Sequence, residues 1–420
     1  MLSFLKREKN IFLVLFIYYI FIAFIAPQTA HHDLKGFFLP WIKSFLETGV
    51  QNVYKNPLIN YPPITIYVLY GFGYISQLLH LSLDSTIVYL RQVVFLFDLG
   101  TFYFFIKIMQ RFKLPLFTII FFFCNVALIY NTIFWAQLDA IYTFFVVFSV
   151  YCVVTRRPLL SSFALVCALA SKPQAFIFIP VIGLLLLPYF VKDKKLILYA
   201  FLIGLVTLLV LFFPYLYYGT LADYFQIIKK TTDYYPFVSM FAYNYWLLLF
   251  GIDKISHIPD LDKFFGVSYR VWGLGMFALW NIALLFPVFT VVKSHWKHRR
   301  AFTHLEWQVV FLALTQIALA FFFFSTQMHE RYAHAAIVFA AIFALVSRRY
   351  YMYAVLSIAY LVNLTALHNG LSFNLSQFIK PHIVALAYGM VLIYGTIELY
   401  WLRYKSDKED KELSLTNQHK

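Results

Sequence analysis

The chain has 420 residues, of which 62% are hydrophobic and 13% are charged, whereas an ordinary soluble domain is about 45–50% apolar and about 25% charged. This composition excludes a soluble globular protein, a disordered chain and a nucleic-acid-binding protein, and it predicts an all-α polytopic membrane protein. The formal charge of +15 then reports orientation in the membrane rather than a polyanionic partner.

Apolar runs along the chain predict about twelve transmembrane helices, with ends uncertain by about two to four residues. We expect these spans at residues 11–27, 86–108, 114–131, 138–154, 158–170, 173–190, 195–217, 271–292, 305–325, 332–346, 350–367 and 383–403. The first run follows a basic start and is interpreted as an uncleaved span rather than a signal peptide. Residues 1–403 are therefore expected to form one transmembrane domain.

Basic residues mark every joint that lies inside if the N-terminus is cytoplasmic. These joints carry Lys107, Arg111, Lys113, Arg156, Arg157, Lys192, Lys194, Lys195, Lys293, Lys297, Arg299, Arg300, Arg348, Arg349 and Arg403. Short basic loops stay on the cytoplasmic side of a membrane. The pattern predicts an integral multi-pass protein of the plasma membrane, and we favour the bacterial cytoplasmic membrane. Residues 404–420 form its solvated, disordered cytoplasmic tail.

Two segments on the opposite, outer side are much longer than simple connections. The first outer loop covers residues 28–85 and the second covers residues 218–270. Counting the apolar run 62–81 as a span would invert every later joint, so we expect an interfacial or re-entrant helix there. Long structured loops are common places for function.

The first loop begins with His31, His32 and Asp33, followed by aromatic residues. A carboxylate beside imidazoles at the exit of a membrane helix is suited to general-base chemistry. The alternative is that Asp33 caps a helix at residues 34–48, because Asp is a favourable N-cap.

Two further polar groups interrupt the apolar runs on the outer side. Gln137 and Asp139 follow Trp135 and could hold a hydroxyl-rich ligand, although Asp139 could also cap the span after it. Lys172 and Gln174 surround Pro173. A lone cation at such a break can bind a phosphate or can simply extend its ammonium group to the interface.

The later outer segments carry Asn244 and Trp246, and then His329, Glu330 and Arg331. The three consecutive ionisable residues are functional candidates because charge at a membrane span is costly, although they could equally pair with one another or with neighbours. A zinc-protease motif is excluded because no His-Glu-x-x-His spacing occurs.

In the order of these motifs, the chain resembles the GT-C superfamily of integral-membrane glycosyltransferases, and most nearly the bacterial mannosyltransferase-related proteins similar to GPI-anchor mannosyltransferases. The resemblance is carried by Asp33 in the first outer loop, Asn60-Tyr61-Pro62-Pro63, Gln137-Leu138-Asp139, Lys172-Pro173, Asn244-Tyr245-Trp246 and His329-Glu330-Arg331-Tyr332. It covers most of the chain.

The resemblance implies an inverting enzyme with a polyprenyl-phosphate monosaccharide as donor and with mannose favoured. The acceptor is a lipid-linked glycan, a glycolipid or a protein on the extracytoplasmic face. Asp33 is then the catalytic base, and Arg331, His329 and Lys172 bind the donor phosphate. The implied substrate-binding residues are His32, Tyr61, Gln137, Asp139, Gln174, Asn244, Trp246 and Glu330. Histidines replace the paired acids of many relatives, so we expect no metal and no cofactor.

Two other functions fit the same composition. A transporter or flippase of a lipid-linked sugar would use the charged outer residues for gating, although it should also place charges near the bilayer midplane. A polyprenyl-linked glycan ligase or polymerase would share the donors and the outer loops.

The orientation can be tested with single cysteines at Gln51, Ser256 and Ser372 in the outer loops and at Ser294 in an inner joint. We expect a membrane-impermeant thiol reagent, added to intact cells, to label the first three positions and to spare Ser294. Labelling of Ser294 together with protection of Gln51 would reverse the orientation.

Overall fold

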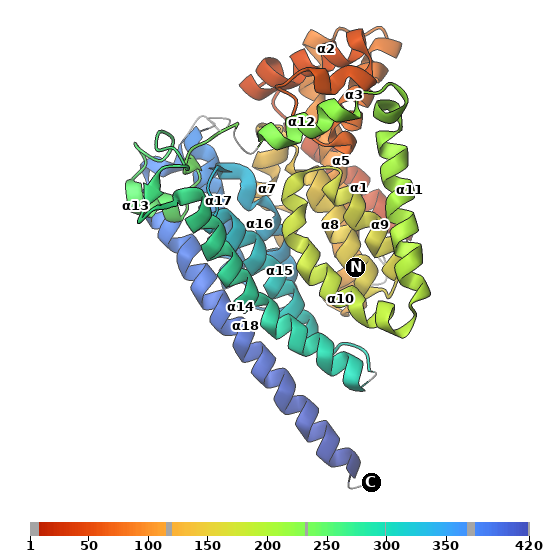
Figure 1. The fold of residues 1–420 in the computed structure, drawn as a ribbon, viewed down its shortest axis with the longest axis vertical. Helices are drawn as coiled ribbons and strands as arrows, with labels where there is room; N and C mark the ends of the chain where they lie inside the picture. Colours follow the sequence, from red (N-terminus) through yellow and green to blue (C-terminus); the bar gives the residue numbers. More distant parts are fainter. Residues whose placement is uncertain (1–7, 115–119, 232–233, 299, 368–373, 419–420) are drawn as a thin grey trace. The chain divides into compact units, whose positions relative to one another are not determined.

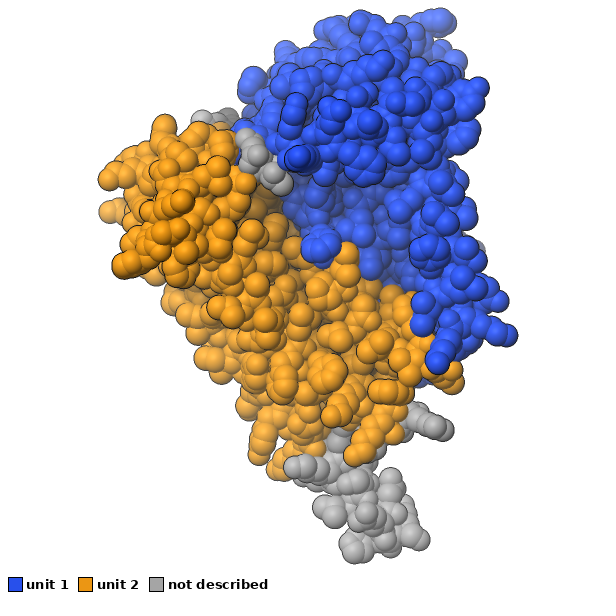
Figure 2. Space-filling view, in the orientation of Figure 1, with its two compact units in different colours: residues 1–108, 115–176, 193–235 blue, residues 109–114, 177–192, 236–420 orange. Residues whose placement is uncertain are grey.

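The computed structural model describes residues 8–114, 120–231, 234–298, 300–367 and 374–418. The chain forms two compact units (Figure 2). Unit 1 contains residues 1–108, 115–176 and 193–235, and unit 2 contains residues 109–114, 177–192 and 236–420. Ser372, residues 115–119 of the expected span 114–131, and the first seven residues lie outside the described part.

All the regular secondary structure in the described residues of unit 1 is helical (Figure 1). Its elements are α1 (Glu8–Ile25), η2 (Leu34–Phe38), α2 (Leu39–Thr48), η3 (Val50–Lys55), α3 (Pro63–Leu78), α4 (Leu83–Thr86), η4 (Ile87–Tyr89), most of α5 (Leu90–Arg111), α6 (Ile120–Phe123), α7 (Val126–Ile129), η6 (Tyr130–Phe134), α8 (Asp139–Val154), α9 (Pro158–Leu169), the start of η7 (Pro173–Phe178), α11 (Lys195–Tyr217) and α12 (Leu221–Thr231).

Where the structure describes it, unit 2 combines long helices with four strands of two residues each. Its elements are α10 (Ile179–Lys192), β1 (Ser239–Met240), α13 (Tyr245–Phe250), β2 (Lys263–Phe264), β3 (Val267–Ser268), α14 (Tyr269–His298), α15 (His304–Phe324), β4 (Met328–His329), η8 (Glu330–Ala333), α16 (His334–Ser347), α17 (Tyr351–Leu367), η9 (Leu375–Gln377) and α18 (Pro381–Gln418). Strand β1 pairs with β4 in parallel, and β2 pairs with β3 in an antiparallel hairpin.

Within the described residues, eight helices are long and apolar enough to cross a membrane. They differ greatly in burial: 94% of the apolar window of α15 is buried, but only 6% of that of α11. Helix α11 exposes large side chains such as Phe201 and Val210, and so extensive an apolar surface is stable against lipid rather than water. The predicted all-α membrane protein is confirmed at this level.

The number of spans stays a prediction. Helices α8, α9 and α17 are apolar but shorter than the eight. The described part of the expected span 114–131 is not one helix, because Asn125 interrupts it and accepts a hydrogen bond from the Leu128 N–H at 3.1 Å as the N-cap of α7. A side chain that bonds its own backbone in this way competes with a continuous helix.

The expected disordered tail is wrong for most of its length, because α18 continues as a helix to Gln418. Side chains one helical turn apart support this extension. Arg403 forms an ion pair with Asp407, and the Lys405 ammonium lies 3.9 Å from the centre of the Trp401 ring. Pairs at this spacing stabilise exposed helices.

The core of unit 2 is built around α15, which contacts α14, α16 and α18. Its start is fixed by a capping box in which Thr303 and Glu306 bond each other's backbone N–H groups. Arg300 also donates to both carboxylate oxygens of Glu306 at 2.7 and 2.8 Å. The charged residues at this buried helix end therefore satisfy one another.

In unit 1, α8 and α9 form a tight hairpin. Arg156 adopts a φ of 60° in the turn, and Pro158 opens α9. The Ser149 hydroxyl then donates to the Ser161 carbonyl oxygen at 2.9 Å across the two helices. This hairpin presents the first turn of α8 at one end, and that turn carries a candidate site residue, Asp139.

The first long loop is a folded layer of α2 and α3. Pro63 occupies the first turn of α3, where a proline replaces an N–H that has no helical partner. A Cβ at Gly73 would collide with the Ile42 side chain, so the glycine allows α2 and α3 to approach closely. The predicted interfacial placement of the 62–81 run, which includes α3, stays a prediction.

Candidate functional site

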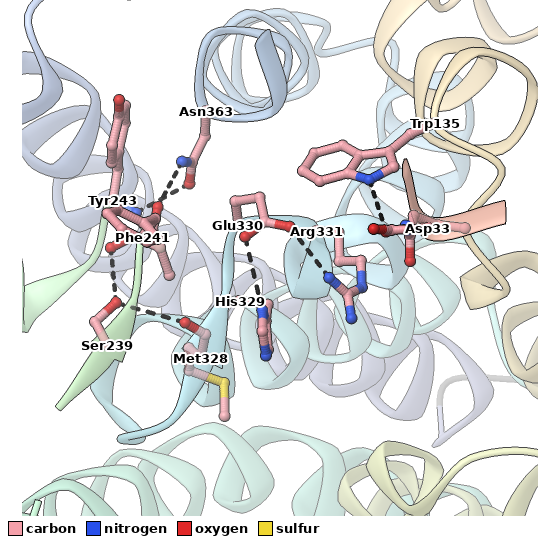
Figure 3. A network of polar contacts seen from close by, with 12 residues as sticks. Asp33, Trp135, Ser239, Phe241, Tyr243, Met328, His329, Glu330, Arg331 and Asn363 are labelled. Carbon is pink, nitrogen blue, oxygen red and sulfur yellow. Dashed lines mark hydrogen bonds and ion pairs between the residues drawn. The ribbon is translucent and has the colours of Figure 1, made fainter. Parts of the chain in front are cut away.

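Asp33 is held from one side by two fixed N–H donors. Its Oδ2 atom accepts hydrogen bonds from Trp135 Nε1 at 3.0 Å and Gln137 Nε2 at 2.6 Å (Figure 3). Among the described residues, nothing donates to Oδ1, and the residue is partly exposed. The side chain makes no capping bond to the helix after it. Asp33 occupies the N-cap position of η2, but the side-chain capping bond that the alternative interpretation requires is not formed.

The segment that carries Asp33 is anchored by Arg91 of α5, which sequence reasoning did not select. Arg91 is fully buried, and its guanidinium donates to the carbonyl oxygens of Pro27 at 3.0 Å and Thr29 at 2.9 Å. The available signal was a single arginine inside the expected span 86–108, because a cation there is costly unless it has a structural or functional partner.

His31 supports the same segment as a neutral base. Its Nδ1 atom accepts the Asp33 backbone N–H at 3.3 Å. Burial lowers the pKa of His31 and outweighs the opposing effect of Asp33, with smaller lowering by His32 and Arg91. A neutral imidazole keeps the lone pair that this hydrogen bond requires.

Trp135 and Gln137 reach Asp33 because the backbone between them is irregular. The π-helical turn η6 ends with a hydrogen bond from Trp135 N to Tyr130 O at 2.9 Å, and Gln137 N donates to Asn131 O at 2.9 Å. Ala136, which separates them, has a φ of 64°. This left-handed conformation is unfavourable for alanine, and such local strain is concentrated at functional sites.

Asp139 binds Lys172 instead of a free ligand. The Lys172 Nζ atom lies 2.5 Å from Asp139 Oδ1, and the two side chains are only 5% and 1% exposed. Lys172 therefore does not extend to the interface. Asp139 lies in the first turn of α8 and does not act as its N-cap, which is Leu138. In this conformation the predicted phosphate-binding cation is already neutralised.

The surroundings of this pair include a second acid that the sequence analysis missed. Asp98 of α5 is buried and close enough to Asp139 for the two carboxylates to interact electrostatically. Ser171, next to Lys172, accepts the Thr65 hydroxyl of α3 at 2.7 Å. The ion pair thus joins the start of α8 to the layer that contains α3.

The remaining predicted residues of unit 1 lie in a series of neighbouring aromatic rings and in the short helix η7. His32 is exposed and begins a series of neighbouring rings that continues through Phe37, Trp41 and Tyr61, with centroids 5.9 to 6.2 Å apart. Gln174 lies in η7, and its buried Oε1 atom accepts no hydrogen bond from the described residues. Aromatic rings can bind a sugar, whereas the Gln174 amide oxygen would first have to become accessible.

In unit 2, Glu330 joins the two cationic candidates (Figure 3). Its Oε1 atom lies 3.2 Å from Arg331 Nη1, and its Oε2 atom lies 3.8 Å from His329 Nδ1. Glu330 is 2% exposed, whereas the Arg331 and His329 side chains are 16% and 11% exposed. The carboxylate is enclosed and the cations retain limited access to solvent.

A β-bridge positions this cluster. Strand β1 pairs Ser239 with Met328 and Met240 with His329. Gln327, just before β4, has a φ of 61° and donates its backbone N–H to Phe237 O at 3.1 Å. These contacts turn the chain directly before the three ionisable residues.

Asp260 holds the same turn through side-chain hydrogen bonds, and the sequence analysis did not select it. It is fully buried and accepts hydrogen bonds from both Arg270 Nε and Nη2, from the Thr326 hydroxyl and from Gln327 Nε2, all at 2.8 to 3.0 Å. A carboxylate with four donors is fully satisfied and holds two segments in one register.

Asn244 and Trp246 are buried, and their polar groups are used inside unit 2. Asn244 caps α13 and donates to Phe322 O at 3.2 Å, and Trp246 Nε1 donates to Phe324 O at 2.9 Å. Their predicted contact with substrate would require this packing to open. Asn363 supports the loop before them through 2.9 Å hydrogen bonds to Tyr243 N and Phe241 O (Figure 3).

The structure thus brings together some predicted residues, and others belong to different units. Asp33 meets Gln137, and Asp139 meets Lys172, all in unit 1; His329, Glu330 and Arg331 form one cluster in unit 2. Among the described residues, no three His, Cys, Asp or Glu side chains form a candidate metal site.

No protein-family model matches the chain, and no curated protein matches it significantly.

The buried Asp139–Lys172 pair predicts a strong non-additive effect on stability. Lys172→Met should lower the unfolding free energy by about 3–5 kcal/mol because it leaves a buried carboxylate unpaired, and adding Asp139→Asn should recover most of that loss. Thermal unfolding of purified protein in detergent measures both.

The exposed Lys43–Asp84 pair provides the matched control, since its side chains are 43% and 66% exposed. Lys43→Met should leave the unfolding midpoint nearly unchanged. Equal stability of the Lys172→Met protein and the wild type would contradict the structural importance of the buried pair.

Proposed function

We propose that the protein is an inverting glycosyltransferase of the GT-C type. It transfers a monosaccharide, with mannose favoured, from a polyprenyl phosphate to a glycan, glycolipid or protein acceptor on the extracytoplasmic face. The observation that carries the proposal is the Asp33 carboxylate, which has one oxygen held by Trp135 and Gln137 and the other without a donor among the described residues. A general base needs this combination of fixed orientation and an open lone pair.

The proposed reaction is a single displacement. The acceptor oxygen attacks the anomeric carbon, its proton passes to Asp33, and the bond between that carbon and the phosphate oxygen breaks. The polyprenyl phosphate leaves with the bonding electron pair. One carboxylate is sufficient for such a displacement, because no covalent intermediate has to be formed and broken.

The leaving phosphate gains negative charge as the bond breaks, so a cation must stabilise it. Arg331 is the favoured group because its guanidinium can donate two parallel hydrogen bonds to a phosphate. Its contact with Glu330 at 3.2 Å orients the guanidinium before the donor binds. His329 supports the same role, whereas Lys172 is occupied by Asp139.

Several features support a membrane-embedded transferase of this type without deciding its family. Eight apolar helices can enclose a lipid-linked donor, and the segments predicted as outer loops carry folded elements such as α2, α3, α12 and α13. We further propose about twelve spans and the outward orientation predicted from the basic joints.

Asp33→Asn should reduce the turnover number by about a hundredfold or more while the donor dissociation constant stays within about twofold, because only the proton acceptor is removed. The assay uses purified protein with labelled polyprenyl-phosphate mannose, glucose and arabinose. Asp84→Asn, which changes an exposed acid in the same unit, is the control and should retain full activity. Full turnover by the Asp33→Asn protein would exclude Asp33 as the catalytic base.

Arg331→Ala should weaken donor binding by at least about tenfold, because a charge-assisted hydrogen bond contributes about 1.5–3 kcal/mol. Arg331→Lys should recover only part of this loss, since lysine keeps the charge but not the planar pair of donors. Glu330→Gln should have a smaller effect. Donor binding measured by displacement of a fluorescent polyprenyl phosphate tests the series, with Arg111→Lys as a control.

The same preparation separates an enzyme from a transporter. Detergent removes the two compartments that transport requires, so a new glycosidic bond formed there supports the transferase. Persistent absence of product with all three donors and with both glycolipid and peptide acceptors would favour a flippase or transporter. Transfer of a whole glycan chain would instead indicate a ligase or polymerase.

A further inference from the structure

Unit 1 contains a large apolar groove apart from Asp33. Its volume is about 740 Å³, and it lies between α3, the segment from Leu81 to the middle of α5, and Phe144 of α8. Almost all its lining is apolar or aromatic. The two small hydroxyls in the lining are satisfied within their own helices, because Ser76 donates to Phe72 O at 3.0 Å and Thr86 donates to Ser82 O at 2.9 Å. The groove therefore offers no polar contact beyond tyrosine hydroxyls and suits hydrocarbon.

The groove follows one face of α3. Its lining includes Tyr67, Gly71, Ile75 and Leu79, which recur at every fourth residue and so lie along one side of the helix. Twelve residues of helix cover roughly 18 Å, so the groove is long enough to hold an extended stretch of hydrocarbon. The Tyr67 hydroxyl donates to Leu211 O and closes the groove beside α11. These dimensions fit one extended hydrocarbon chain.

Gly71 gives the groove its open floor. A Cβ atom at Gly71 would meet no heavy atom within 4 Å, whereas one at Gly100, which also lines the groove, would collide with the Phe144 ring. Glycine within a helix is less favourable than other residues by up to about 1 kcal/mol. Close packing against other parts of the protein does not explain why position 71 is a glycine. A molecule that occupies the groove would explain it, because a side chain there would take up the same space.

The walls of the groove are also the supports of Asp33. Arg91 of α5 anchors the chain at Pro27 and Thr29, while its neighbours Tyr89 and Val93 line the groove. The η2 turn that follows Asp33 contacts η4, which ends at Tyr89. A chain bound in the groove would therefore be held by the same turns of helix that orient the base.

We propose that this groove binds the hydrocarbon chain of a membrane-anchored glycan acceptor. The inference rests on the proposed function and narrows its acceptor to a lipid-linked one. The base must act on the acceptor hydroxyl, so an anchor shared with Asp33 delivers the acceptor rather than the donor. The residues proposed to bind the donor phosphate belong to unit 2, whereas the groove and Asp33 belong to unit 1.

The test fills the groove with Gly71→Ala, Gly71→Leu and Gly71→Phe in the full-length protein. Increasing size should progressively block the chain, while helix propensity is maintained or improved. Gly183→Leu in α10 is the matched control, because a Cβ at Gly183 also meets no heavy atom within 4 Å and the residue is outside the groove. Unfolding midpoints identify any variant that is misfolded.

Binding is measured by photo-crosslinking, which needs no turnover. The probe is a polyprenyl-diphosphate disaccharide with a diazirine in its hydrocarbon chain, and a diazirine-bearing polyprenyl-phosphate mannose is used in parallel. We expect the disaccharide lipid to label α3 and α5, and Gly71→Leu to reduce that labelling by about tenfold or more, since several buried methylene groups are lost. Gly183→Leu should label like the wild type.

Activity gives a second and separable result. Gly71→Leu should lower kcat/KM for the long-chain acceptor by a similar factor and leave a butyl-linked acceptor unchanged. Labelling of the groove by the donor probe, or equal displacement of the acceptor probe by phosphatidylethanolamine, would overturn the proposal. Glycolipid labelling without product under any condition would overturn the transferase but support a lipid-linked glycan in the groove.

Discussion

Charge inside an apolar chain is the constraint on which this structure depends. Several buried charged side chains are each surrounded by an opposite charge or by backbone carbonyl groups, because an unpaired buried ion is costly. Asp139 meets Lys172, Asp260 meets Arg270, and Arg91 meets two carbonyl oxygens. The Asp139 and Arg91 contacts join segments that are distant in sequence, and Asp260 does so through Gln327. These polar contacts therefore help to determine where the segments lie within each unit, together with apolar packing.

Sequence patterns predicted the parts of the fold that depend on composition. Long apolar runs become helices near their expected ends, as at α11 and α15, because such helices satisfy their own backbone in lipid. The break at Asn125 was missed because a local capping bond is decided over three residues, a length too short to alter an apolar run. The helical end of α18 was missed because its support comes from individual side-chain pairs.

The candidate site was predicted as separate residues, without their partners. Asp33 and Gln137 were both selected, but their contact depends on the left-handed backbone at Ala136, which no periodicity signals. Lys172 looked like a free cation because its partner lies 33 positions away along the chain. Asp260 and Asn363 were missed since their importance comes only from the segments that they join. Long-range pairing is the information that a single sequence does not contain.

The length of α18 has a practical consequence. A helix of 38 residues extends for about 57 Å, nearly twice the roughly 30 Å hydrocarbon core of a bilayer. The charged stretch from Arg403 to Glu412 thus belongs to the same continuous helix that packs in unit 2. A globular protein fused in helical register to this end would be joined to unit 2 by an uninterrupted helix, and would serve as an alignment marker for electron microscopy.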